Sequence, residues 1–102
     1  MAIIIVNNEN YNAEVINSDK PVILDFYADW CGPCKKLTPI VEAISEEENV
    51  KVCKINVDDS PEIAANFKIM SIPTLVVIKN GKETAKAVGM RSKSEIIKMI
   101  NG

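Results

Sequence analysis

The chain has 102 residues, enough for one domain and too few for two. Its apolar fraction of 47% fits an ordinary soluble globular protein. Its 12 basic and 14 acidic side chains leave a formal net charge of −2 with no basic tract, which excludes the electrostatic footprint of a nucleic-acid or anionic-membrane binder. We therefore expect one domain over residues 1–102.

The first predicted elements are a short strand and a helix. Apolar residues indicate the strand over Ile3–Val6. An apolar run this short, with no positive charge before it, does not fit a signal peptide. The helix is predicted over Asn8–Ser18, with Tyr11, Val15 and Ile16 turned inward.

The next two elements are marked more clearly. The near-continuous apolar run Val22–Ala28 is typical of a strand covered on both faces. From Pro33 onward the apolar period becomes helical. Pro39 has no amide hydrogen to donate, so we expect it to kink this helix. The spacing i, i+3, i+4, i+7 predicts an inward stripe of Leu37, Ile40, Val41 and Ile44.

A third strand is predicted over Val50–Val57. The short helix that follows begins at Ser60 and Pro61, an N-cap residue and a proline at the first helical position. It is expected to bury Ile63, Ala64 and Phe67.

The remaining sequence predicts a hairpin and a last helix. The strands Thr74–Lys79 and Lys82–Val88 flank Asn80-Gly81, a strong hairpin signal. Ser92 and Glu95 have the spacing of a capping box ahead of the helix. The order β-α-β-α-β-α-β-β-α predicts an α/β fold, with a mixed central β-sheet flanked by helices on both faces.

Cys31 and Cys34 lie where the long second strand gives way to the helix. A thiolate, not a thiol, attacks a disulfide. Cys31 stands at the helix N-terminus, where unpaired amides and the helix dipole stabilise negative charge. Cys34 lies one turn inside, on the inward stripe. We predict an exposed, activated Cys31 that attacks a disulfide and a covered Cys34 that resolves the mixed disulfide.

A thiolate metal site is the alternative to redox chemistry, because C-x-x-C is also half of a zinc ribbon. A ribbon needs a second cysteine pair, whereas Cys53 is alone in a predicted strand, and the chain has no histidine. We favour redox chemistry with no metal and no cofactor besides the Cys31–Cys34 pair. Cys53 is interpreted as a small buried apolar residue.

The cysteine count also bears on the compartment. Three cysteines, an odd number, argue against a fully paired secreted framework. A close cysteine pair in a reducing compartment is more often catalytic or metal-binding than structural. No segment approaches the ~20 apolar residues of a membrane helix. We expect a cytoplasmic protein with no membrane partner.

Asp25 interrupts an apolar strand between Leu24 and Phe26, so it is expected to be buried. A lone buried carboxylate should have a raised pKa, and no histidine competes with it as a general base. The alternative interpretation is a structural carboxylate paired with Lys54, the one charge within the apolar part of the third strand. The two interpretations are compatible.

The chain resembles the thioredoxin family over essentially its whole length. The segments that carry the resemblance are Asp25–Asp29, Trp30–Cys34 (WCGPC), Ile72-Pro73-Thr74, Lys79-Asn80-Gly81 and Val88-Gly89. This resemblance implies the thioredoxin fold. It also implies a general protein disulfide reductase, cycling between a Cys31/Cys34 dithiol and disulfide.

The resemblance implies roles for further residues. Asp25 would accept the proton of Cys34 during resolution, with Lys54 as a modulator. Pro73 would follow a cis peptide bond, and backbone groups of Ile72 would pair with an extended substrate segment. The substrate-binding face would consist of Trp30, Gly32, Pro33, Ile72, Pro73 and Gly89.

The resemblance further implies a thioredoxin reductase that recharges the pair, disulfide-containing proteins as substrates, and a monomer. The alternatives are a disulfide isomerase or oxidase of the same fold, and a non-catalytic binding subunit of a larger assembly. Isomerases and oxidases usually carry histidine between the cysteines, where the imidazolium stabilises the thiolate. Gly32 and Pro33 supply no such charge, which favours the reductase.

Overall fold

The structure is a computed structural model that describes residues 3–47 and 49–102. The elements alternate along the chain in the predicted order. They are β1 (Ile4–Ile5), η1 (Asn12–Ile16), β2 (Val22–Tyr27), α1 (Gly32–Glu47), β3 (Lys51–Asn56), α2 (Pro61–Asn66), β4 (Thr74–Lys79), β5 (Lys82–Val88) and α3 (Lys93–Asn101).

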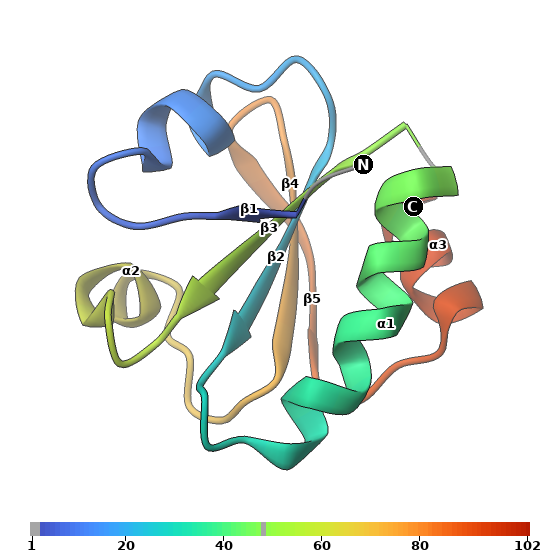
Figure 1. Ribbon diagram of the computed structural model, residues 1–102. Helices are drawn as coiled ribbons and strands as arrows, with labels where there is room; N and C mark the ends of the chain where they lie inside the picture. The colour runs from blue at the N-terminus through green and yellow to red at the C-terminus, as the bar shows by residue number, and fades with distance from the viewer. Residues whose placement is uncertain (1–2, 48) are drawn as a thin grey trace.

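One five-stranded sheet with the order β1-β3-β2-β4-β5 forms the centre of the molecule. Strands β1, β3 and β2 are parallel, whereas β4 is antiparallel to both β2 and β5. Helices α1 and α3 cover one face of the sheet, and η1 and α2 cover the other (Figure 1). The parallel strands require crossover connections, which the helices supply. The predicted mixed sheet with helices on both faces is confirmed.

Side chains of the central strands alternate between two apolar cores. In β2, Leu24 and Phe26 pack on the side of η1 and α2, whereas Ile23 packs on the side of α1 and α3. Asp25, two residues after Ile23, therefore points toward α1. In β3 the same alternation puts Lys54, the register partner of Asp25, on this face. The sheet thus places a carboxylate and an ammonium side by side beneath α1.

The predicted helix over Asn8–Ser18 is wrong in length and type. The helical segment is much shorter, and the five residues Asn12–Ile16 form a π-helix. The side chain of Asn7 accepts hydrogen bonds from the amides of Glu9 and Asn10, and such local bonds compete with helix formation. The i→i+5 turn also changes the direction of successive side chains, so Ile16 is 40% exposed rather than inward.

The predicted hairpin and the predicted capping box are both confirmed. Asn80 and Gly81 join β4 to β5 with φ of 53° and 79°, the two positive values of a type I′ turn. At the start of α3 the Ser92 hydroxyl accepts from the Glu95 amide at 3.2 Å, and the Glu95 carboxylate accepts from the Ser92 amide at 2.8 Å.

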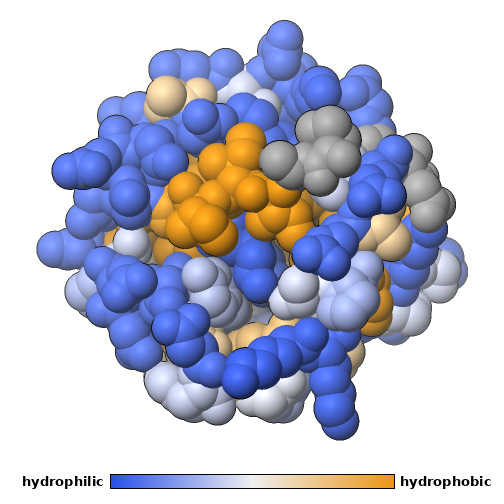
Figure 2. Space-filling model, in the orientation of Figure 1, coloured by the Kyte–Doolittle hydropathy of each residue, from blue (hydrophilic) through white to orange (hydrophobic). Residues whose placement is uncertain are grey.

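Hydrophilic side chains cover much of the surface seen in Figure 2. An apolar patch lies over the edge strand β1, where Ile5 is 55% exposed. Within the described part of the chain, no helix combines the length and the apolar character needed to cross a bilayer.

The turn residue Gly81 offers a test of the hairpin. We expect Gly81→Ala to lower the free energy of unfolding by about 1 kcal/mol, because an L side chain is strained at a φ of +79° although no neighbour blocks it. Gly32→Ala is the matched control, since its added Cβ would meet nothing within 4 Å and Gly32 lies in a helix. Equal losses in denaturant unfolding would contradict this account of the turn.

Candidate active site

Cys31 and Cys34 form a disulfide at the end of the molecule where β2 leads into α1. Their Cα atoms are 5.3 Å apart. Cys31 directly precedes α1, and its carbonyl accepts a hydrogen bond from the Lys35 amide at 3.4 Å, as an N-cap residue does. The turn before it is closed by the Cys31 amide, which donates to the Ala28 carbonyl at 3.2 Å.

The start of α1 points a hydrogen-bond donor at the outer sulfur. The Cys34 amide, one of the unpaired donors of the first helical turn, donates to Cys31 Sγ at 3.2 Å. A hydrogen bond of this kind becomes stronger when the sulfur carries negative charge. The geometry therefore favours a thiolate at Cys31 after reduction, with the helix dipole acting in the same direction.

The predicted difference in exposure between the two cysteines is wrong for the disulfide form. Cys31 is 4% exposed and Cys34 is 2% exposed. The reason is packing: the disulfide and Ala28 form one buried cluster, against which Tyr27, Val57 and Ile72 pack. What distinguishes the two residues is their position on α1, because only Cys31 stands in front of the helix.

The residues predicted to bind substrate surround the disulfide with unequal exposure. Trp30 is 72% exposed, and its indole Nε1 donates to Asp58 Oδ2 at 2.9 Å. Gly32 and Pro33 are also exposed, whereas Ile72 and Gly89 are half-buried. An apolar pocket of about 390 Å³ lies beside this face, lined by Trp30, Val57, Ala64, Ile69, Met70, Ser71 and Ile72.

The expectation for the peptide bond before Pro73 is confirmed. The Ile72–Pro73 bond is cis. Pro73 is buried, not part of an open surface, and its carbonyl accepts a hydrogen bond from the Gly89 amide at 2.8 Å. Gly89 has a φ of 90°, a conformation that favours glycine. Pro73 therefore adds little exposed surface to the predicted substrate-binding face. Its contribution is the position of its backbone.

Asp25 is fully buried, and neither carboxylate oxygen has a hydrogen-bond partner among the described residues. Burial raises the pKa of this carboxyl from its usual 3.8 to about 6, while the nearby Lys54 charge acts in the opposite direction. The predicted burial and the predicted direction of the pKa change are both confirmed. A carboxyl with this pKa exists in both protonation states near neutral pH.

The predicted pairing of Asp25 with Lys54 is not formed as an ion pair. Lys54 Nζ instead donates to Thr38 Oγ1 at 3.0 Å and lies 4.3 Å from the centre of the Tyr27 ring. The Thr38 hydroxyl donates in turn to the Cys34 carbonyl at 3.2 Å. Lys54 therefore acts on Asp25 only through space, and its direct contacts are with α1 and an aromatic ring.

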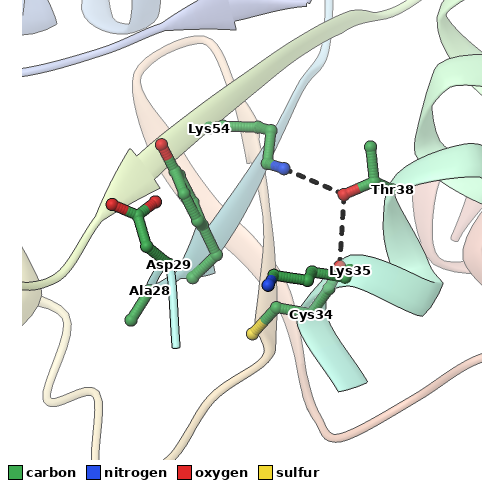
Figure 3. A pocket seen from close by; sticks show the side chains of 7 residues that line it. Ala28, Asp29, Cys34, Lys35, Thr38 and Lys54 are labelled. Carbon is green, nitrogen blue, oxygen red and sulfur yellow. Dashed lines mark hydrogen bonds between the residues drawn. The ribbon is translucent and has the colours of Figure 1, made fainter. Parts of the chain in front are cut away.

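Lys54, Thr38 and Tyr27 line a pocket of about 320 Å³ next to Cys34, which Asp25 does not line (Figure 3). The lining residues are Tyr27, Ala28, Asp29, Cys34, Lys35, Thr38 and Lys54. Sequence reasoning did not single out Thr38 or the contact of Tyr27 with Lys54. The signal for Thr38 was its spacing, since a residue four positions after Cys34 lies above it on the same helix face.

Cys53 takes no part in this site. It is fully buried in β3, on the face opposite to α1. Burial raises the pKa of its thiol to about 12, so it remains protonated at physiological pH. The interpretation of Cys53 as a small buried apolar residue is confirmed. Over residues 3–47 and 49–102, no group of three or more cysteine or acidic side chains could hold a metal ion.

Comparison with known proteins agrees with this geometry. Residues 2–102 match the model of the Thioredoxin family. The chain is 46% identical to the thioredoxin of Rickettsia bellii (strain RML369-C) over 94% of this chain and 93% of that protein. It is 45% identical to the thioredoxin of Porphyra purpurea over 99% of this chain and 96% of that protein. A solved structure of a thioredoxin mutant from Halobacterium salinarum NRC-1 superposes with a TM-score of 0.89 at 31% identity, covering 99% and 93% of the two chains.

The raised pKa of Asp25 predicts a pH-dependent stability. A carboxyl with a pKa of about 6 when folded and 3.8 otherwise favours folding while it is protonated. This contribution is fully present below about pH 4 and is lost as the pH rises through about 6. The difference of about two pKa units corresponds to roughly 3 kcal/mol.

We expect Asp25→Asn to remove this pH dependence. The free energy of unfolding of the variant, relative to that of the parent protein, should then rise by up to about 3 kcal/mol between pH 4 and pH 8. Denaturant unfolding of the oxidised proteins measures it. Asp29→Asn, at an exposed carboxylate in the next loop, is the control and should give no such trend. Parallel curves for the parent and Asp25→Asn would show that Asp25 titrates normally.

Proposed function

The chain belongs to the thioredoxin family and is a thiol–disulfide oxidoreductase that reduces protein disulfides, and on this premise we propose how its residues share the reaction. The observation that carries the proposal is the hydrogen bond from the Cys34 amide to Cys31 Sγ at the start of α1. It supports Cys31 as the nucleophile, with Cys34 as the resolving residue.

In the first step the Cys31 thiolate attacks one sulfur of a substrate disulfide. The bond between the two substrate sulfurs breaks, a mixed disulfide forms, and one substrate thiolate leaves. In the second step Cys34 loses its proton and attacks Cys31 Sγ, which releases the second substrate thiolate. Two electrons pass to the substrate, and the protein is left with the Cys31–Cys34 disulfide.

We assign the proton of Cys34 to Asp25. The support is its position and its pKa: the carboxylate is buried, lies on the sheet face beneath α1, and accepts no hydrogen bond from residues 3–47 or 49–102. A pKa of about 6 lets it take up a proton near neutral pH, which an ordinary carboxylate does poorly. Lys54 is proposed to modulate this proton affinity through its charge.

We propose that substrates dock on the face formed by Trp30, Gly32, Pro33, Ile72, Pro73 and Gly89. The exposed indole of Trp30 and the adjoining apolar pocket support this face. Ile72 packs against the disulfide cluster and lies outside the strands of the sheet. Its backbone groups are proposed to pair with an extended substrate segment next to the reacting sulfurs.

We further propose the setting in which the chain works. Residues 1–102 form one thioredoxin domain that acts as a cytoplasmic monomer. A thioredoxin reductase, nicotinamide–flavin or ferredoxin-linked, restores the dithiol, and no cofactor is needed besides the disulfide itself. Neither nucleic acid nor membrane is a partner. The family membership and the net charge of −2 support these assignments.

Cysteine variants test the assigned roles. We expect Cys34→Ser to accumulate mixed disulfides with substrate proteins, because attack proceeds and resolution cannot. Cys31→Ser should trap none. Non-reducing gels after incubation with a disulfide-containing protein separate these outcomes. Cys53→Ala is the matched control, since it removes a thiol outside the site and should cycle like the parent. Equal trapping by both active-site variants would contradict the roles.

The reduction potential tests the direction of the reaction. A reductase of this family is expected near about −270 mV, whereas an isomerase lies near about −180 mV. We expect the lower value, because Gly32 and Pro33 place no positive charge between the cysteines. Equilibration with glutathione buffers measures it, and a potential close to the isomerase value would overturn the assignment as reductase.

A further inference from the structure

The Thr38 hydroxyl connects two parts of the active site (Figure 3). It accepts a hydrogen bond from Lys54 Nζ at 3.0 Å and donates one to the Cys34 carbonyl at 3.2 Å. A hydroxyl has a single proton to donate, and here the backbone carbonyl takes it. The lone pairs of the oxygen are therefore left for the ammonium, which makes Thr38 an oriented acceptor for Lys54.

The aromatic ring of Tyr27 holds the same ammonium from another direction. Lys54 Nζ lies 4.3 Å from the ring centre, within the range of a cation–π contact. Lys54 has a long flexible stem, so its charge can be placed differently if one of these contacts is lost. One acceptor for it is Asp25, its register partner on β2, whose two oxygens have no hydrogen-bond partner within the described part of the chain.

We propose that Thr38 is a positioning residue of the reaction: its hydroxyl holds the Lys54 ammonium at the Cys34 turn of α1 and so prevents the cation from pairing with Asp25. The importance of this arrangement for turnover rests on the proposed role of Asp25 as proton acceptor. Nothing in the family resemblance points to Thr38; its two hydrogen bonds do.

The chemical consequence concerns the proton of Cys34. During resolution this proton moves from Cys34 Sγ to Asp25, so the carboxyl must bind a proton well. An ammonium in direct contact would stabilise the ionised carboxylate and weaken it as a base. By holding the Lys54 ammonium at Thr38 Oγ1, Thr38 lets burial dominate, in agreement with the raised pKa of Asp25.

Few other charges act on Asp25 from the surrounding elements. On its β4 side the register partner is Leu75, which is apolar. The titratable residues that line the pocket beside Cys34 come from β2, β3, α1 and the loop after β2, and are Tyr27, Lys54, Cys34, Lys35 and Asp29. Of these, Lys54 is the charge that acts on the pKa of Asp25. Lys54 is the charge whose position the proposal requires, and Thr38 is its hydrogen-bond acceptor.

The test is a direct titration of the Asp25 carboxyl by NMR in the oxidised protein. We expect Thr38→Val, which keeps the shape and removes the hydroxyl, to lower the titration midpoint by about one pH unit or more. Thr38→Ser keeps the hydroxyl and should restore the parent midpoint within a few tenths of a unit. The acid limb of the pH profile for resolution of a mixed disulfide should move down with the midpoint.

Two controls separate positioning from a general effect on the helix. In a Lys54→Met background, Thr38→Val should cause no further shift, because no ammonium is left to move. Ser45→Ala removes another side-chain-to-carbonyl bond on α1, from Ser45 Oγ to the Glu42 carbonyl at 2.7 Å, and should leave the midpoint unchanged. Thr38→Ala gives the same measurement if Thr38→Val fails to fold.

An unchanged or raised midpoint in Thr38→Val would overturn the proposal. So would a shift that persists without Lys54, or one that Thr38→Ser does not reverse. A lowered midpoint with an unchanged pH profile has a different meaning: it supports the positioning by Thr38 and contradicts the proposed role of Asp25 as base. The experiment therefore distinguishes failure of the positioning role of Thr38 from failure of the role of Asp25 as base.

Discussion

The chemistry of this chain depends on where α1 begins. Strand β2 ends shortly before Cys31 and Cys34, and α1 starts directly after Cys31. The Cys34 amide therefore points at the Cys31 sulfur. Packing of α1 on the sheet fixes this relation, because Leu37, Val41 and Ile44 are fully buried against it. The buried core thus keeps the Cys34 amide, which has no partner within the helix, directed at only one of the two sulfurs, that of Cys31.

The second constraint is a buried carboxylate, Asp25, which has no hydrogen-bond donor among the residues that the structure describes. Isolated charges are rarely buried in proteins, and such a group changes its pKa in preference to remaining ionised. At Asp25, burial outweighs the opposing Lys54 charge, so the pKa of the carboxyl is raised. Under the proposal for Thr38, the position of the Lys54 ammonium decides how far this charge offsets the burial.

Much of the fold could be predicted from residue patterns, because the spacing of apolar residues and the residue types of turns are local features of the sequence. The boundaries of the β4–β5 hairpin follow from Asn80-Gly81, and the start of α3 follows from Ser92 and Glu95. The short π-helix could not be anticipated, since competing side-chain bonds of Asn7 decide it. The burial of Cys31 depends on Val57 and Ile72 from distant segments. The direction of Lys54 depends on its contacts with the Thr38 hydroxyl and the Tyr27 ring, which no apolar period encodes.

Trp30 is the only tryptophan of the chain, and its side chain stands exposed beside the reactive pair, tethered to Asp58 by its indole nitrogen. The tryptophan fluorescence of the chain therefore comes from this one side chain. The fluorescence of this indole can therefore report, without an attached dye, whether a partner covers the proposed docking face.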